Sequence, residues 1–134
     1  MSKFVLEPCN DINGKIVFFK ILEDSYCSWN EFCKEIESDA TWEDQLDLLK
    51  SRMDEVANLK LMPYTKFHKL DPPKTDEYEV KTANLRAYLL LDSNGYIIMY
   101  AGKKTDQPKD LITFRAIKKR YLNANKNDIE RKAT

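Results

Sequence analysis

The sequence predicts an α+β domain built on an antiparallel sheet, and two observations support this prediction. Apolar runs of strand length lie within residues 4–22 and 77–103 and are separated by turn signals. Two segments between these runs, and one after the last of them, space their apolar residues as helices do. With 134 residues, 43% of them hydrophobic, the chain suits one domain with its own core. We expect that domain to span residues 1–124, followed by a polar, frayed tail at 125–134.

The chain begins with two short strands and then a helix. The apolar runs 4–8 and 15–22 flank Asn13-Gly14, which is a turn signal, so we expect a hairpin or two edge strands. Residues 28–31, SWNE, have the form of a capping box. In such a box the Ser28 hydroxyl accepts a hydrogen bond from an N–H group of the first helical turn.

A second, longer helix follows. Residues 41–44, TWED, open it in the same manner, and it ends before Pro63. The stripes that we expect to face the core are Trp29, Phe32, Cys33 and Ile36 on the first helix and Trp42, Leu46, Leu49, Met53 and Val56 on the second. Residues 63–76 form a connector, in which Pro72 and Pro73 exclude regular structure.

The last predicted elements are three strands within 77–103 and a third helix within 105–124. The helix is capped near Asp106 and has Pro108 in its first turn, where proline is favoured. Its core-facing residues are expected to be Leu111, Phe114, Ile117 and Tyr121, beside a basic strip of Arg115, Lys118 and Lys119.

Charge is distributed unevenly, although the net charge is zero. Residues 1–62 carry 7 Lys/Arg and 13 Asp/Glu, whereas residues 63–134 carry 15 Lys/Arg and 9 Asp/Glu. Such a split indicates a face that meets an anionic partner. The alternative is that the charges of the two halves interleave in space.

The cysteines and the apolar runs exclude several classes of protein. Cys9, Cys27 and Cys33 show no metal-ligand spacing, and the chain has one histidine, so we expect no metal, no cofactor and no disulfide framework. We interpret the cysteines as small buried hydrophobes in a reducing compartment. No run has the length of a signal peptide or a membrane span, so we expect a cytoplasmic protein without a membrane partner.

Turn positions bring three cations together on the predicted sheet. A two-residue loop at Asn94-Gly95 pairs Arg86 with Lys103, and a weaker loop at Ala83-Asn84 pairs Lys81 with Arg86. Directly paired residues share a face. Lys81, Arg86 and Lys103 would therefore form one row, with Glu79, Tyr88 and Ala101 in the next row.

A row of like charges has a cost, which indicates a ligand. Opposed like charges destabilise a sheet by up to about 1 kcal/mol per pair, and a phosphate chain would relieve this repulsion. The sheet can also relieve it without a ligand, in one of three ways. The strand ends can splay, Glu79 and solvent can absorb the repulsion, or a register slip of one residue can move the cations to opposite faces.

Four segments carry a resemblance to a known family: "EYEVK" (77–81), "NLRAYLL" (84–90), "YIIMYAGKKTDQPKDLI" (96–112) and "AIKKRYL" (116–122). They resemble the RelE/HigB superfamily of toxin–antitoxin toxins, most closely its phage-derived, HigB-like branch. The resemblance implies a RelE-like fold, with two N-terminal helices on one face of an antiparallel sheet and a C-terminal helix.

The function implied by the resemblance is that of a type II toxin. Such toxins bind the ribosomal A site and cut mRNA on the open face of the sheet. The implied partners are the ribosome, mRNA and a cognate antitoxin, a helix-turn-helix protein encoded nearby.

The resemblance also implies the site residues. By motif, the catalytic candidates are Glu79, Lys81, Arg86 and Lys103. Arg86 would stabilise the phosphorane, Lys81 or Glu79 would act as the base, and Lys103 or Lys104 would position phosphates or protonate the leaving group. The further RNA-binding candidates are Lys104, Tyr88, Tyr100, Arg115, Lys118 and Lys119. We expect His68, in the connector, to be a bystander.

Two other functions fit the same sequence. A ParE-like toxin would inhibit DNA gyrase by binding it, without using the row of cations. A catalytically silent module of the same fold would bind a protein or nucleic acid.

Overall fold

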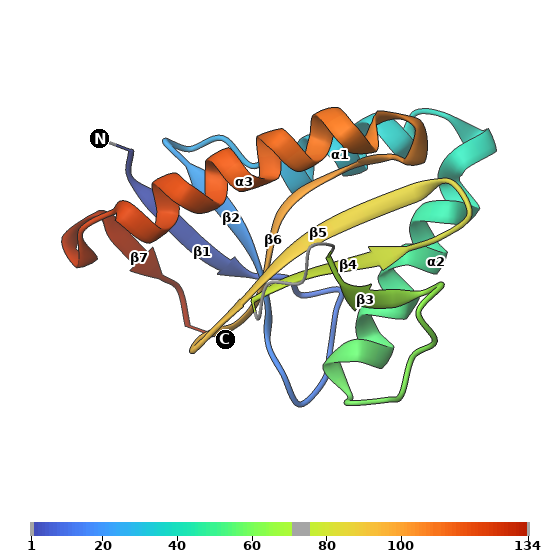
Figure 1. Cartoon of the computed structure of the whole chain (residues 1–134), viewed down its shortest axis with the longest axis horizontal. Helices are drawn as coiled ribbons and strands as arrows, with labels where there is room; N and C mark the ends of the chain where they lie inside the picture. Colours follow the sequence, from blue (N-terminus) through green and yellow to red (C-terminus); the bar gives the residue numbers. More distant parts are fainter. Residues whose placement is uncertain (1, 71–75, 134) are drawn as a thin grey trace.

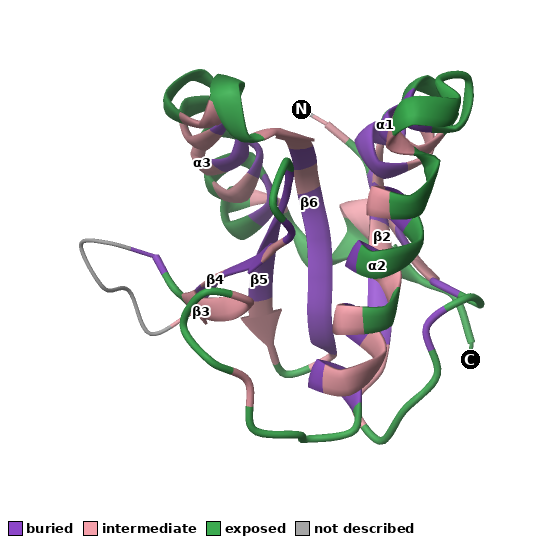
Figure 2. Cartoon of the chain, turned by 90° about the vertical axis from the view of Figure 1, so that its right-hand side faces the viewer, coloured by how far each residue is buried: buried purple, intermediate pink, exposed green. Residues whose placement is uncertain are grey.

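The computed structural model describes residues 2–70 and 76–133, and it has three layers (Figures 1 and 2). The elements are β1 (Phe4–Pro8), β2 (Phe18–Glu23), α1 (Ser28–Glu37), α2 (Ala40–Ala57), β3 (Phe67–Lys69), β4 (Glu77–Lys81), β5 (Leu85–Asp92), β6 (Gly95–Lys103), η1 (Lys104–Asp106), α3 (Gln107–Asn123), η2 (Lys126–Asp128) and β7 (Ile129–Arg131). The predicted α+β class is confirmed, together with all three expected helices.

The sheet is mixed rather than antiparallel. Its strand order is β3-β4-β5-β6-β2-β1-β7, in which β2 pairs parallel with β6 and β1 pairs parallel with β7. The pair β1–β2 is antiparallel, but β2 lies inside the sheet instead of at an edge. Phe18 faces the core below α1 and α2, whereas Phe19 faces the core below α3, so both faces of β2 are covered. A strand buried on both faces requires a continuous apolar run.

Each face of the sheet has its own hydrophobic core. Figure 2 shows buried residues along β5 and β6, with α3 on one side and α1 and α2 on the other. The core under α1 and α2 contains Ile36, Leu46, Leu49, Met53 and Val56, and the core under α3 contains Phe114, Ile117 and Tyr121. These helical stripes therefore face inward as expected. Cys9 and Cys27 are buried, and all three cysteines are free thiols.

The helix starts differ from the two predicted capping boxes. Ser28 is the first residue of α1, and its Oγ donates a 2.8 Å hydrogen bond to the carbonyl oxygen of Met99 on β6. The cap of α2 is Asp39, whose Oδ1 accepts from the Thr41 N–H at 3.0 Å. Both predictions placed the start by local pattern alone, and a tertiary contact to β6 takes the Ser28 hydroxyl instead.

Substitutions at Ser28 separate the two roles. A capping serine tolerates aspartate, because a carboxylate also accepts from the helix N–H groups. A serine that donates to the Met99 carbonyl oxygen does not tolerate aspartate, because the carboxylate would face that oxygen in a buried site. We expect Ser28→Ala to lower the free energy of unfolding by about 1 kcal/mol and Ser28→Asp to lower it further. Urea denaturation measures both free energies. A more stable Ser28→Asp than Ser28→Ala would instead support a capping role for Ser28.

Two short strands arise in segments that we expected to be irregular. In the connector, β3 pairs antiparallel with β4, and the Phe67 ring stacks on Tyr78 with ring centroids 5.3 Å apart. The predicted effect of Pro72 and Pro73 lies outside the described residues. In the C-terminal tail, β7 adds to the sheet beside β1, so the frayed tail predicted for 125–134 is wrong for Ile129–Arg131.

Ion pairs connect the acidic and basic halves of the chain. Arg120 Nε lies 2.6 Å from Glu23 Oε2, and Lys132 Nζ lies 3.4 Å from Glu7 Oε2. Part of the opposite charge on the two halves is therefore neutralised by contacts between them, as the interleaving alternative predicts.

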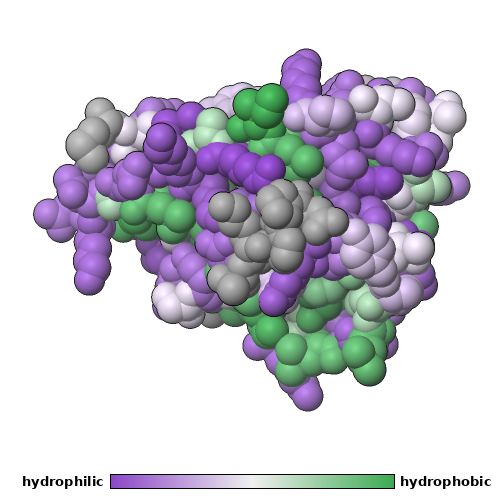
Figure 3. Space-filling view, viewed as in Figure 1, coloured by the Kyte–Doolittle hydropathy of each residue, from purple (hydrophilic) through white to green (hydrophobic). Residues whose placement is uncertain are grey.

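The face in Figure 3 is mostly hydrophilic and has a hydrophobic region at its lower end. The loop after α2 lies there in Figure 1 and exposes Leu59, Leu61 and Tyr64. None of the described helices is long and apolar enough to cross a membrane.

Candidate functional site

The register of the β5–β6 hairpin decides which cations share a face. The loop is Ser93-Asn94, one residue earlier than predicted, so Asp92 pairs with Gly95. This moves the pairing by two residues and leaves the faces unchanged. A β-bulge between Tyr88 and Leu89 then shifts the register back by one residue, so the net shift at Arg86 is one residue.

The predicted row is therefore wrong for Lys103. Arg86 pairs with Gly102, and Lys103 pairs with Leu85, on the face covered by α1 and α2. The Lys103 Nζ lies 5.1 Å from the centroid of the Trp42 ring on α2. Lys81 does pair with Arg86, as predicted. A one-residue bulge reverses the side on which every later residue points.

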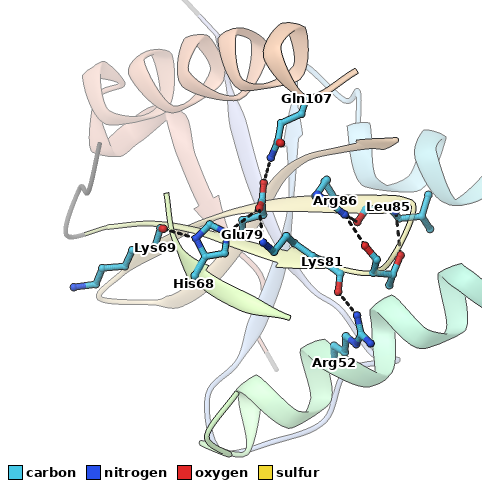
Figure 4. Close-up of polar contacts among 9 residues, drawn as sticks. Arg52, His68, Lys69, Glu79, Lys81, Leu85, Arg86 and Gln107 are labelled. Atoms are coloured by element: carbon cyan, nitrogen blue, oxygen red, sulfur yellow. Dashed lines mark hydrogen bonds and ion pairs between the residues drawn. The ribbon is translucent and has the colours of Figure 1, made fainter. Parts of the chain in front are cut away.

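A polar cluster forms around Glu79, between the β3–β4–β5 strands and the start of α3 (Figure 4). Glu79 is 2% exposed. Its Oε1 lies 2.9 Å from His68 Nε2 and 4.0 Å from Lys81 Nζ, and its Oε2 accepts a hydrogen bond from the Gln107 side chain. The carboxylate is thereby held in one orientation beside the Lys81–Arg86 pair.

Lys81 is partly buried beside other charged groups. Burial lowers the pKa of its ammonium group, and the charges of Arg86 and Lys104 lower it further, against the opposing effect of Glu79. The ammonium also lies 4.8 Å from the centroid of the Tyr64 ring. Arg52 on α2 donates a 2.5 Å hydrogen bond to the Lys81 carbonyl oxygen, which fixes the end of β4.

Arg86 is held at the β4–β5 turn. Its Nη1 donates to the carbonyl oxygens of Thr82, at 2.6 Å, and Leu85, at 2.9 Å, while its buried Nε has no hydrogen-bond partner among the residues described. Arg86 forms no ion pair within the part of the chain that the structure describes. A guanidinium that is oriented by main-chain carbonyls but not neutralised retains its charge for an anion.

Three other candidates are ion-paired or buried within the fold. Arg115 and Lys118 form ion pairs with the buried Glu77, at 3.1 and 2.9 Å, so these cations clamp α3 to β4. Tyr88 is 0% exposed and cannot stack on a base. Lys119 is exposed on α3. The face that carries Glu79 and Arg86 is also the one that α3 covers, so it is not an open face.

His68 is the site residue that sequence reasoning missed. We expected a bystander, but β3 pairs it directly with Glu79. Its ring stacks on Tyr64 with centroids 4.0 Å apart, and Nδ1 lies 2.5 Å from the Lys69 carbonyl oxygen. Only recognition of β3 in the connector would have found it, because strand pairing puts His68 beside Glu79.

Tyr100 belongs to a different environment, next to Asp110 on α3. Burial raises the pKa of the Tyr100 hydroxyl, and the charges of Asp110, Asp106 and Glu35 add to this effect. Asp110 is 4% exposed, and its Oδ2 has no hydrogen-bond partner within residues 2–70 and 76–133. Burial, together with the nearby Asp106, raises the pKa of Asp110 to about 6.

The raised pKa makes Asp110 a source of pH-dependent stability. The folded chain binds the Asp110 proton more tightly than the unfolded chain, so the free energy of unfolding falls as the pH rises from about 4 to about 6. We expect Asp110→Asn to raise the free energy of unfolding by about 2 kcal/mol above that window and to have little effect near pH 4. Urea denaturation of both proteins across this pH range measures the difference. An equal gain at both ends would contradict a charge effect.

The cluster thus combines four groups that together offer three chemical uses. Glu79 or Lys81 can accept a proton, Arg86 can stabilise negative charge, and His68 can carry a proton to or from Glu79. Among the described residues, no group of three His, Cys, Asp or Glu side chains is arranged to hold a metal ion.

The chain matches no family model, no curated protein and no solved structure.

Proposed function

We propose that this protein is an RNA-cutting toxin of the RelE/HigB type that cleaves mRNA in the ribosomal A site. The observation that carries the proposal is the Lys81–Arg86 pair beside Glu79, in which the pKa of Lys81 is lowered and Arg86 is oriented but not neutralised. RNA cleavage by the 2′-hydroxyl needs a base and a fixed positive charge, and no metal.

Each group has a defined task in this reaction. Lys81, in its neutral form, removes the proton of the 2′-hydroxyl, and Glu79 is the alternative base. The oxygen then attacks the neighbouring phosphorus, and the guanidinium of Arg86 stabilises the charge of the phosphorane. The bond between phosphorus and the 5′-oxygen breaks, the proton taken up by the base passes to that oxygen, and a 2′,3′-cyclic phosphate remains. Lys104, whose charge lowers the pKa of Lys81, would position the phosphate chain or protonate the leaving oxygen. Lys103 has no role in this scheme, because it faces α2.

The order of elements supports the finer fold assignment. Helices α1 and α2, the antiparallel strands β4 to β6 and helix α3 follow the order that the resemblance implies, whereas β1, β2, β3 and β7 lie outside that pattern. Because α3 covers most of the face, we propose that RNA approaches the β4–β5 turn beyond the N-terminus of α3. There Lys81 and Arg86 lie at the margin of the sheet (Figure 4).

The partners follow from this function. The toxin would act in the cytoplasm, where it meets the ribosome and mRNA, and a helix-turn-helix antitoxin encoded nearby would neutralise it. We propose that the antitoxin covers the Lys81–Arg86 end of the sheet and the region of residues 107–133.

Primer extension on an mRNA in a purified translation reaction tests the proposal. The wild-type protein and Lys81→Ala are each assayed with and without ribosomes. We expect new 5′ ends from the wild type with ribosomes present and none from Lys81→Ala. Cuts that do not need ribosomes would support nuclease activity but contradict the need for the ribosomal A site. No cuts from folded wild-type protein would reject the nuclease and leave gyrase inhibition or a silent module.

A further inference from the structure

A cavity of about 230 Å³ lies between α1, the end of β6 and the start of α3. It exists because β2 pairs only with the first part of β6, from Tyr96 to Ile98. Beyond that point the two strands separate, as Figure 1 shows. The start of α1 lies beside β6 there, where Ser28 binds the Met99 carbonyl oxygen. The cavity is separate from the Lys81–Arg86 pair, and neither of these residues lines it.

Asp110 supplies this cavity with a buried carboxyl group that lacks a partner. It lines the cavity at 4% exposure, and its Oδ2 forms no hydrogen bond with any residue that the structure describes. The approach to β6 is close, because a Cβ added at Gly102 would overlap that oxygen. A buried carboxylate without a partner is costly, so a donor or cation that entered the cavity would be stabilised.

The other lining groups select a cation. Glu31, Glu35 and Asp106 line the cavity together with two tyrosines, Tyr26 and Tyr100. Carboxylates attract a positive charge, and aromatic faces stabilise one within about 6 Å of the ring centre. Tyr26 is 60% exposed, so its ring is accessible to a ligand at the mouth.

Two lysines also line the cavity but do not neutralise Asp110. The ammonium of Lys103 lies over Trp42, on the side of α2. Lys109 is exposed, and its effect on the pKa of Asp110 is smaller than those of burial and Asp106. The cavity therefore retains an excess of negative charge.

We propose that this cavity binds a primary alkylammonium group, with Asp110 as its anionic partner and the Tyr26 and Tyr100 rings beside it. The group can belong to a free polyamine or to a lysine side chain of another protein, because both present the same ammonium on an alkyl chain. This site does not depend on RNA cleavage, and its test involves no RNA.

A titration followed by backbone amide NMR tests the proposal. The probes are n-butylammonium, putrescine as the free polyamine, and Nα-acetyl-lysine methylamide as the side-chain source. We expect saturable shifts of amides in 26–36 and 100–110. Tighter binding of putrescine would assign a free amine, and tighter binding of the lysine derivative would assign a protein partner.

Three variants make the test specific. Asp110→Asn should weaken n-butylammonium binding by about 10-fold or more, because it removes a charge-assisted hydrogen bond. Tyr26→Ala, at an exposed position, should weaken binding by a few-fold, as expected for a lost cation–π contact. Asp44→Asn, an exposed carboxylate on α2, should leave binding unchanged. Equal binding by Asp110→Asn and the wild type, or shifts that never saturate, would overturn the proposal.

Discussion

Under the proposed function, Arg86→Gln is expected to lower the rate of mRNA cleavage by about 100-fold or more, because it removes the positive charge that we propose stabilises the phosphorane. The guanidinium is oriented by the Thr82 and Leu85 carbonyl oxygens and has no carboxylate partner among the described residues. Arg86→Lys should keep part of the activity, since it keeps the charge but not the planar geometry. Single-turnover cleavage of a ribosome-bound mRNA measures these rates.

Lys103→Gln is the matched control for this prediction. Arg86 pairs with Gly102, and Lys103 is the next residue along β6, so its side chain points to the opposite face of the sheet. Lys103→Gln therefore removes an equal charge from a neighbouring position on that other face. We expect its cleavage rate to stay within about 3-fold of the wild type. A loss equal to that of Arg86→Gln would show that the face assignment does not govern activity. Urea denaturation of each variant separates lost chemistry from lost folding, because Arg86 also binds the β4–β5 turn.

Gly95→Ala is expected to cause the largest loss of stability, about 3 kcal/mol. Gly95 has a φ of +134°, which residues with a side chain rarely adopt. A Cβ at this position would also overlap the carbonyl oxygen of Val17. That oxygen accepts a 3.1 Å hydrogen bond from the Tyr96 N–H, at the start of the β2–β6 pairing. The methyl group would thus strain the turn and separate two central strands.

Urea denaturation measures this loss as a lower midpoint at an unchanged slope. Ser93→Ala, at an exposed position in the same turn, is the control and should change the free energy of unfolding by less than about 0.5 kcal/mol. If Gly95→Ala were as stable as Ser93→Ala, neither the positive φ nor the contact with Val17 would constrain the turn.

Local pattern was sufficient to predict the helices and most strands. The apolar stripes of Leu46, Leu49 and Met53 on α2, and of Phe114 and Ile117 on α3, recur at helical spacing, and all five residues are buried. Helix type depends on contacts within a few residues, which the sequence displays directly. The pairing of Lys81 with Arg86 was also predictable, because a tight turn joins their strands.

The contents of the candidate site depended on features that no local pattern displays. The bulge next to Tyr88 moved Lys103 to the other face, although the Asn-Gly signal had located the hairpin correctly to within one residue. Strand β3 brought His68 to Glu79 from a segment that we expected to be irregular. Both events follow from which strands pair, and pairing between distant segments is selected by packing of the whole sheet.

The sequence by itself therefore determined that this chain folds as an α+β domain with three helices, and it located the Lys81–Arg86 pair. Only the tertiary structure decided that the sheet is mixed, that Arg115 and Lys118 pair with Glu77, and that Asp110 Oδ2 has no hydrogen-bond partner in the described part of the chain. The physical reason is the range of the interactions. Helical periodicity arises between near neighbours, whereas burial and charge pairing arise between residues that only the completed fold brings together.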